Sequence, residues 1–300
     1  MSATTAMPPT RRGRRRLSRR RWSPVHLFAA LAMLLGVSIL LYPSAAQWLS
    51  DRAHATEVSG YVERVEAAPP AELQRLLAEA KDYNTRLPQG PLRDPYVLTE
   101  AGSPAPAAGD VDYYNAQLST GLNAPMARVR IPEISLDLPV YHGTDPATLD
   151  KGIGHLLGSS VPTGGLDTHA VLTGHSGLPG ARLFTDLHEL KVGDRFFIEV
   201  AGQTLTYEID QILTVTPEDA ELLRRDPNGD YVTLLTCTPT GINTHRLLVR
   251  GARVETVSSG LADETLPPDV AEQAFPWWIV ALTASAVAAG WLARPRRRLR

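Results

Sequence analysis

Residues 230–251 read DYVTLLTCTPTGINTHRLLVRG, which is two runs of strand-forming residues separated by a turn. The first run ends at Cys237, the turn contains proline, glycine and asparagine, and the second run begins at Arg246. Apolar and β-branched runs on either side of such a turn predict a β-hairpin. In this hairpin, the thiol of Cys237 and the guanidinium of Arg246 lie towards the same end of a sheet.

Basic clusters and apolar runs at both ends of the chain indicate export and a membrane topology. Residues 1–24 contain eight arginines and no acidic residue, and an apolar run follows at 25–46. Residues 275–293 carry no charge and precede five arginines in 294–300. Each apolar run is long enough to cross a hydrocarbon core of about 30 Å as a helix. The positive-inside rule then leaves both basic ends in the cytoplasm and everything between the runs outside the cell.

The first apolar run has two interpretations, a retained anchor or a signal peptide cleaved near residues 44–46. Nucleic-acid binding by the basic ends is disfavoured, because an adjacent apolar run explains each cluster as a topology signal. Without these thirteen arginines, 17 basic residues stand against 32 acidic ones, so the extracellular part is acidic. An acidic surface argues against polyanionic partners.

Cys237 is the only cysteine among the 300 residues. Exported proteins usually pair their thiols, and a single thiol has no partner for an internal disulfide. It is therefore either a buried packing residue or a reactive nucleophile, and the residues around it favour the nucleophile.

The residues between the two apolar runs change from a helical to a β-type pattern. Apolar residues at three- and four-residue spacing predict helices in 47–87, with a break at Pro69 and Pro70. Residues 88–125 are rich in Pro, Gly, Ala and Asp and predict an irregular segment. Its length is unusual for a structureless connection, which indicates a lid or a docking loop.

Residues 126–256 contain short β-type runs separated by turns. Many strands and few helices in a segment of this length indicate one closed β-barrel or a sandwich. No internal repeat and no metal-spaced cluster of Cys and His is present, so neither a metal nor another cofactor is expected. The predicted strands are Arg128–Ile131, Leu136–Tyr141, Ala170–Thr173, Arg195–Val200, Leu205–Val215, Tyr231–Thr236 and Leu247–Val254, with short helices near Pro146–Ile153 and Arg182–Leu187.

A cysteine nucleophile needs a base to reach its thiolate form, and often a cation to hold the oxyanion. Among eight histidines, His175 is the best candidate, because it follows an apolar strand and lies in a glycine-rich loop. Its position alone also fits a structural histidine. His142, His155 and His169 flank strands or turns, which favours surface or packing roles.

These segments together strongly resemble the sortase family of cysteine transpeptidases, and class C, the pilus-assembling sortases, most closely. TLLTC (233–237) is followed by TPTGINTHRLLVRG, and AVLTGHSGLPGARLFTDL (170–187) lies upstream. The resemblance covers roughly residues 55–295. It implies that Cys237 is the nucleophile, His175 the general acid/base and Arg246 the cation that positions the oxyanion and substrate.

The resemblance also implies a mainly β fold, a closed eight-stranded sortase-type β-barrel with short helices. N-terminal helices and a lid precede this barrel, and two membrane spans flank it. The expected organisation is a basic cytoplasmic N-terminus (1–24), an anchor or signal peptide (25–46), a helical region (47–87), a lid and connecting loop (88–125), the catalytic barrel (126–256), an acidic tether (257–274), a transmembrane helix (275–293) and a basic cytoplasmic tail (294–300).

The segment LRDPYV (92–97) resembles the Asp-Pro-aromatic lid of class C sortases. By this resemblance, Asp94 pairs with Arg246, Pro95 forms the turn and the ring of Tyr96 covers the sulfur of Cys237. An ordinary Asp-Pro turn is the alternative. Tyrosine stands where the family more often has Phe or Trp.

The implied activity is acyl transfer at the cell membrane, with the catalytic domain outside the cell. Cys237 cleaves an LPxTG-like sorting signal between Thr and Gly, and a lysine amine of a pilin subunit resolves the thioester. The expected partners are LPxTG-bearing pilins or surface proteins, the acceptor lysine and the membrane, without nucleic acid. The alternatives are a housekeeping sortase that uses an amine of peptidoglycan, a cysteine peptidase that uses water, and a non-catalytic surface module.

Overall fold

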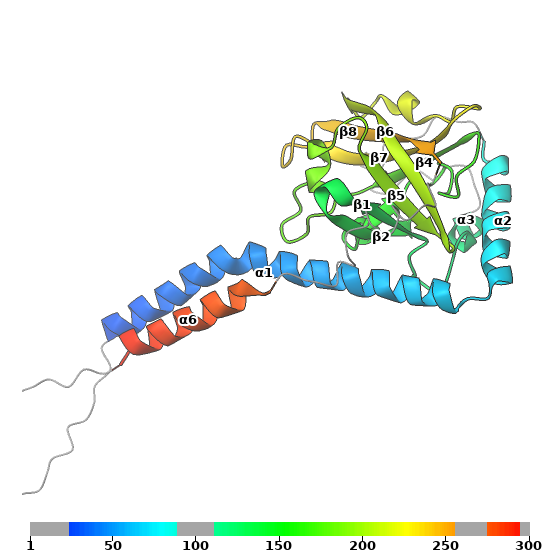
Figure 1. Ribbon diagram of the computed structural model, residues 1–300. Coiled ribbons are helices and arrows are strands. Elements are labelled where there is room, and N and C mark those ends of the chain that lie inside the picture. Colours follow the sequence, from blue (N-terminus) through cyan, green and yellow to red (C-terminus); the bar gives the residue numbers. More distant parts are fainter. Residues whose placement is uncertain (1–23, 89–110, 256–274, 295–300) are drawn as a thin grey trace, which may run out of the picture. The chain divides into compact units, whose positions relative to one another are not determined.

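The computed structural model describes residues 24–88, 111–255 and 275–294 (Figure 1). It divides into two compact units. The larger unit is Pro43–Phe275, and the smaller unit combines Met1–Tyr42 with Pro276–Arg300.

The larger unit is built on a closed barrel of eight strands in the order β1-β2-β3-β4-β7-β8-β6-β5. The β2–β3 and β4–β7 pairs are parallel, and the other six pairs are antiparallel. This confirms the expected eight-stranded barrel and excludes the sandwich. The strands are β1 (Ala127–Ile131), β2 (Leu136–His142), β3 (Ile153–His155), β4 (Thr168–Thr173), β5 (Arg195–Val200), β6 (Gln203–Val215), β7 (Asp230–Thr238) and β8 (His245–Val254).

The barrel is filled by apolar side chains that alternate along its strands, as a period of two requires. Ile198 of β5, Leu234 of β7 and Val249 of β8 are completely buried in one core cluster. Phe196 and Tyr207 stack within the same cluster with their ring centroids 5.5 Å apart. The interior is therefore a packed core, and reactive groups have to lie at its ends.

Two of the helices that precede the barrel cover the region in which the apolar spacing predicted helices. α1 (Pro24–Ala67) ends before Pro69, and α2 (Pro70–Arg86) begins with Pro70 in its first turn. Proline disfavours helix in the residue before it but fits the first position of a new helix. In the larger unit, Tyr61 of α1 is buried, and its hydroxyl accepts a hydrogen bond from the backbone N–H of Ala201 (3.1 Å).

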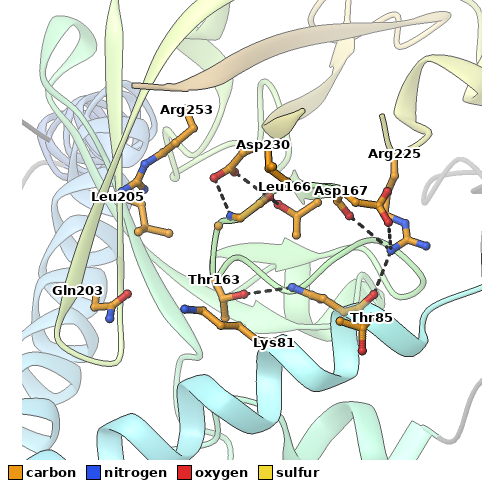
Figure 2. A pocket seen from close by; sticks show the side chains of 14 residues that line it. Lys81, Thr85, Thr163, Leu166, Asp167, Gln203, Leu205, Arg225, Asp230 and Arg253 are labelled. Carbon is orange, nitrogen blue, oxygen red and sulfur yellow. Dashed lines mark hydrogen bonds and ion pairs between the residues drawn. The ribbon is translucent and has the colours of Figure 1, made fainter. Parts of the chain in front are cut away.

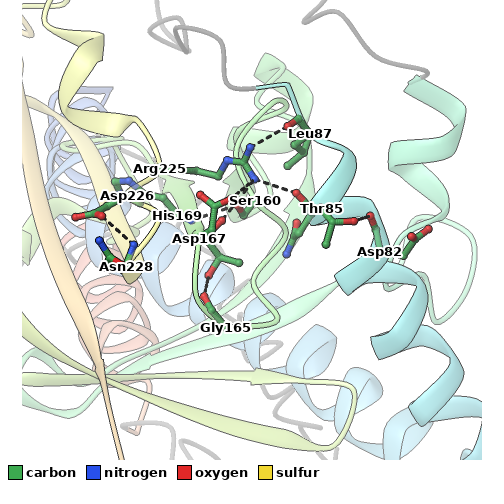
Figure 3. Close-up of polar contacts among 12 residues, drawn as sticks. Asp82, Thr85, Leu87, Ser160, Gly165, Asp167, His169, Arg225, Asp226 and Asn228 are labelled. Carbon is green, nitrogen blue, oxygen red and sulfur yellow. Dashed lines mark hydrogen bonds and ion pairs between the residues drawn. The ribbon is translucent and has the colours of Figure 1, made fainter.

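The C-terminal end of α2 is attached to the barrel by two polar side chains. Asn84 is buried; its amide nitrogen donates to the carbonyl of Val161 (3.0 Å), and its oxygen accepts from the N–H of the same residue (2.8 Å). Arg225 donates to the carbonyls of Asn84 (3.0 Å) and Leu87 (2.8 Å), which have no partner within the helix (Figure 3). These contacts determine where the chain leaves α2.

Three predicted local structures were wrong or incomplete. Ile153 was expected at the end of a helix, but α4 (Pro146–Leu149) stops earlier and Ile153 begins strand β3, which no prediction included. The segment 88–125, expected to be irregular, contains helix α3 (Val111–Ala116). The helix expected at Arg182–Leu187 is the 3-10 helix η2 (Thr185–Glu189).

Two further 3-10 helices are η1 (Pro132–Ile134) and η3 (Ala220–Leu223).

The two apolar runs both form helices. Among the described residues, α1 is the one helix that is both long and apolar enough to cross a membrane. α6 (Trp277–Leu292) is apolar but has 16 residues, so a second span is not established. In the smaller unit, Ala30 of α1 and Ala289 of α6 are buried.

Candidate active site

Cys237 and Arg246 are direct partners across the β7–β8 hairpin. Residues that lie opposite each other in an antiparallel pair project from the same face of the sheet. Both side chains are buried, with Cys237 7% and Arg246 6% exposed. The hairpin predicted from residues 230–251 is therefore confirmed, together with the proximity of these two residues.

The guanidinium of Arg246 is oriented by the loop between the two strands. Its Nη1 donates to the carbonyls of Asn243 and His245, both at 3.1 Å. Glu218, in the connection between β6 and β7, lies close enough for its pKa to respond to this cation. Its pKa is lowered first by a hydrogen bond from Thr216 and also by the charge of Arg246.

His175 is brought to the same end of the barrel by the parallel pairing of β4 with β7. The register pairs Thr173 with Leu235, and the N–H of Gly174 continues it by donating to the carbonyl of Leu235 (3.1 Å). Thr236 donates from its hydroxyl to the carbonyl of Gly174 (2.7 Å). If this register is continued for two residues beyond Thr173, His175 lies beside Cys237.

The loop that carries His175 is connected to the loop after Cys237. The hydroxyls of Ser176 and Thr240 are hydrogen-bonded at 2.8 Å, and the N–H of Gly177 donates to the hydroxyl of Thr185 (3.0 Å). The carbonyl of His175 accepts from the N–H of Phe184 (3.0 Å). The backbone of the histidine is thus held on both sides by neighbouring segments.

The imidazole of His175 is half-buried, and this burial lowers its pKa. The negative charge of Asp150 opposes the effect and raises the pKa. The β3–β4 register explains the proximity of this carboxylate, because Gly154 pairs with Thr173 and the chain just before β3 therefore runs beside His175. Asp150 was missed from the sequence, because its position depends on strand β3, which was itself missed.

Three other histidines have structural roles, as their positions predicted. His155 is completely buried; its Nε2–H donates to the carbonyl of Ser160 and its Nδ1 accepts from the Tyr114 hydroxyl, both at 2.8 Å. Burial lowers its pKa to about 4. His169 accepts from Thr233 and is also buried. His142 donates to the carbonyl of Gln117 (2.7 Å).

Two expectations concern other features of the site. The predicted lid residues Asp94, Pro95 and Tyr96 lie outside the described residues. Within residues 24–88, 111–255 and 275–294, no group of three His, Cys, Asp or Glu side chains is arranged to hold a metal ion.

Comparison with known proteins gives the family of this barrel. Residues 129–254 match the family model described as "Sortase domain". The crystal structure of sortase C-1 from Actinomyces oris is 45% identical in sequence, covers 62% of this chain and is itself covered over 99% of its length, with a TM-score of 0.58. Sortase C1 of Streptococcus agalactiae, solved in complex with MTSET, is 40% identical; the match covers 67% of this chain and 96% of that one, with a TM-score of 0.60.

The curated relatives are more distant. Sortase A of Streptococcus agalactiae is 30% identical over 141 residues, which are 46% of this chain and 56% of that protein. The chain spans between 45% and 62% of the length of the curated relatives that it matches. The similarity to the solved structures, by contrast, extends over nearly their whole length. The chain therefore belongs to the sortase family, and the solved structures that it resembles include those of class C sortases.

Proposed function

We propose that this protein is a membrane-anchored cysteine transpeptidase that cleaves LPxTG-like sorting signals and transfers the acyl group to a lysine amine of a pilin subunit. The observation that carries the proposal is the register of three strands, which brings Cys237, Arg246 and His175 to one end of the barrel. A nucleophile, a base and a cation within one site are the groups that acyl transfer requires.

In the first step, the thiolate of Cys237 attacks the carbonyl carbon of the Thr–Gly bond. A C–S bond forms and the carbonyl oxygen becomes an oxyanion. When this intermediate collapses, the C–N bond breaks and the imidazolium of His175 gives its proton to the departing glycine amine. The products are a thioester on Cys237 and a neutral imidazole.

In the second step, the amine of the acceptor attacks the thioester carbonyl. His175 takes the proton that the amine loses, the C–S bond breaks and the thiolate leaves. With a lysine side chain as acceptor, the product is an isopeptide bond between two subunits. The lowered pKa of His175 favours the neutral imidazole that this step needs.

Arg246 is assigned to the oxyanion and to the backbone of the sorting signal. Two loop carbonyls orient its Nη1, so the guanidinium is already in position before the negative charge develops. A preorganised donor of this kind stabilises the transition state without reorganisation at the moment of reaction.

Membrane attachment through α1 fits this activity. The apolar part of α1 follows the arginine-rich residues 1–24, which favours a cytoplasmic N-terminus and an extracellular barrel. If enzyme and substrates share one membrane face, their effective concentration rises without any additional contact.

The test uses the full-length chain in detergent with an LPxTG peptide, and intact mass spectrometry detects the acyl-enzyme. Wild type is expected to gain the mass of the peptide up to threonine, and Cys237→Ala is expected to gain nothing. Addition of a lysine-bearing pilin peptide should then release a peptide–lysine conjugate. Absence of an adduct on the folded wild-type chain would overturn the transpeptidase assignment.

The reaction with an added acceptor distinguishes the proposed transpeptidase from a peptidase and from a housekeeping sortase. Release of only the free acid, with the lysine peptide present, would identify a peptidase. Transfer to an amine of the peptidoglycan type but not to lysine would identify a housekeeping sortase. Either result leaves the nucleophile in place but contradicts the proposed pilin acceptor.

A further inference from the structure

A second site lies at the opposite end of the barrel from Cys237. A pocket of about 550 Å³ is lined by Thr168 and Asp230, which are the first residues of the parallel strands β4 and β7. Cys237 lies near the end of β7, and His175 follows the end of β4. The pocket is therefore separated from the proposed catalytic groups by the length of the barrel.

The two acidic side chains of this pocket are held to different degrees, because Asp230 accepts hydrogen bonds whereas the Oδ1 of Asp167 is buried without a hydrogen-bond partner among the described residues. Asp230 accepts hydrogen bonds from the N–H of Gly165 (2.7 Å) and from the hydroxyl of Tyr207 (3.0 Å). Asp167 forms an ion pair with Arg225 (3.6 Å). Because Arg225 also binds the end of α2, both carboxylates and this arginine form a fixed frame.

Three further donor side chains line the pocket, and one of them, Arg253, already interacts with the hydroxyl of Tyr207 through its charge and a side-chain hydrogen bond. They come from three different elements, Lys81 from α2, Gln203 from the start of β6 and Arg253 from β8 (Figure 2). Within the part of the chain that the structure describes, the side chains of Lys81 and Gln203 make no hydrogen bond or ion pair. The Nη1 of Arg253 is buried and has no hydrogen-bond partner there, while its guanidinium lies 5.6 Å from the ring centroid of Tyr207. A buried guanidinium nitrogen without an acceptor is costly, and an anionic ligand would supply the acceptor.

The charges of the lining favour a ligand with a single negative charge. Lys81, Arg225 and Arg253 stand against Asp167 and Asp230, which leaves one positive charge in excess. The planar fork of an arginine matches the two oxygens of a carboxylate. Leu166 at the edge of the pocket is 75% exposed and offers an apolar contact next to the charged groups.

We propose that this pocket binds a carboxylate of a peptide in which an apolar residue adjoins the carboxylate. Arg253 binds the two oxygens, Lys81 adds the second positive charge, Gln203 donates a further hydrogen bond and Leu166 contacts the apolar side chain. The carboxylate belongs either to an acidic side chain or to a chain end. This binding site is additional to the proposed transpeptidase site and does not depend on it.

The test measures binding of small peptides to the full-length chain in detergent by isothermal titration calorimetry. The probes are N-acetyl-Leu-Asp-amide for an acidic side chain, N-acetyl-Leu-Leu with a free carboxylate for a chain end, and the neutral N-acetyl-Leu-Asn-amide. At least one acidic probe should bind about tenfold more tightly than the neutral one, as expected for a charge-assisted pair. The comparison of the two acidic probes identifies the source of the carboxylate.

Variants connect the binding to the named residues. Arg253→Gln should weaken it about tenfold, and Lys81→Ala about threefold because that ammonium is more exposed. Arg86→Ala, on the same helix as Lys81 but paired with Asp82, is the matched control and should bind like wild type. If Arg253→Gln lowers the melting temperature, Lys81→Ala and Gln203→Ala still decide the question, because these two side chains make no contact that the fold needs.

Equal binding of the acidic and neutral probes would overturn the proposal, and so would unchanged binding by both Lys81→Ala and Gln203→Ala. Dimethyl phosphate is the final probe, and tighter binding of this phosphodiester than of either peptide would contradict a carboxylate site. The titrations are repeated with Cys237→Ala. Retained binding by this variant would show that ligand binding in the pocket does not depend on transpeptidase activity.

Discussion

Gly177 and Thr240 lie so close together that a Cβ added to Gly177 would be 2.2 Å from the Cγ2 of Thr240. Gly177 belongs to the loop of His175, and Thr240 belongs to the loop that follows Cys237. The backbone of Gly177 also has a φ of +74°, which side chains other than glycine rarely adopt. The two loops therefore meet at a position that only glycine fits, next to the proposed base and nucleophile.

Gly177→Ala is expected to displace the loop of His175 and to slow thioester formation by about 100-fold, since small misplacements of a catalytic group are costly. Intact mass spectrometry over time measures the rate. Gly193→Ala is the matched control, because Gly193 also has a positive φ (+99°) but no atom within 4 Å of its added Cβ. Equal slowing of both variants would mean that general destabilisation, and not the loop contact, causes the loss.

Arg246→Lys is expected to reduce kcat/KM about 100-fold, as for loss of one preorganised donor to an oxyanion. Lysine keeps the charge but loses the planar guanidinium, which the two loop carbonyls hold in place through its Nη1. Arg250→Lys, on the same strand but paired with Asp210, should retain wild-type kinetics. A normal rate in Arg246→Lys would show that charge alone suffices at this position.

Asp150→Asn is expected to lower the pKa of His175 further. Burial already lowers this pKa and the charge of Asp150 opposes it, so loss of the carboxylate leaves the desolvation effect unbalanced. NMR titration of the labelled imidazole measures the shift. Asp210→Asn, on β6, should leave the titration unchanged, and an unchanged or raised pKa in Asp150→Asn contradicts the assignment.

Acid is expected to destabilise the fold through His155. Its pKa is lowered from 6.5 to about 4 in the folded state, so the unfolded chain binds the proton first. The contribution to the free energy of unfolding is complete above pH 6.5 and is lost as the pH falls towards 4, by about 3 kcal/mol. Urea unfolding between pH 4.5 and 7.5 measures this loss.

In the same series, His155→Gln should be less stable at pH 7 but should lose less stability in acid. His188→Gln, at an exposed position, should keep the pH dependence of the wild type. If the pH dependence of His155→Gln matches that of wild type, the protonation of another group governs the acid transition.

Asn84→Ala is expected to lower the free energy of unfolding by about 2 kcal/mol, because the buried N–H of Val161 loses its acceptor and the carbonyl of Val161 keeps only the N–H of Thr163 as donor. Thr85→Ala removes a neighbouring exposed side chain of α2 and should cost less than about 1 kcal/mol. Denaturant unfolding of both variants at one pH measures the difference. Similar costs would show that Asn84 does not hold α2 on the barrel.

The hairpin and its two site residues were predictable from the sequence because they depend on neighbouring residues. Strand alternation and turn residues are local signals, and Cys237 and Arg246 are nine positions apart. His175 could be recognised as a residue at the end of a strand. Its position beside Cys237, however, depends on a parallel pairing between residues 62 positions apart. No local sequence pattern contains that register. The family resemblance, and not a local pattern, connected His175 with Cys237.

The missed elements are short and irregular in pattern. β3 has three residues, of which one is glycine, and it is held by strands on both sides and not by its own propensity. α3 has six residues within a stretch rich in Pro, Gly and Ala, and its stability comes from Tyr114, which is buried against the barrel. Tertiary contacts override local preference in both cases. Asp150 was missed for the same reason, because its position beside His175 depends on β3.

The parallel pairing of β4 with β7 has a consequence for the order in which the site forms during folding. A hairpin closes a short loop, whereas the β4–β7 pairing requires closure of a segment of about sixty residues, which costs more chain entropy and is slower. We therefore expect the thiol and the guanidinium to come together first, and the imidazole to join them only when the barrel closes. A partly folded chain would then carry a cysteine without its base, and chemical competence would require the completed fold.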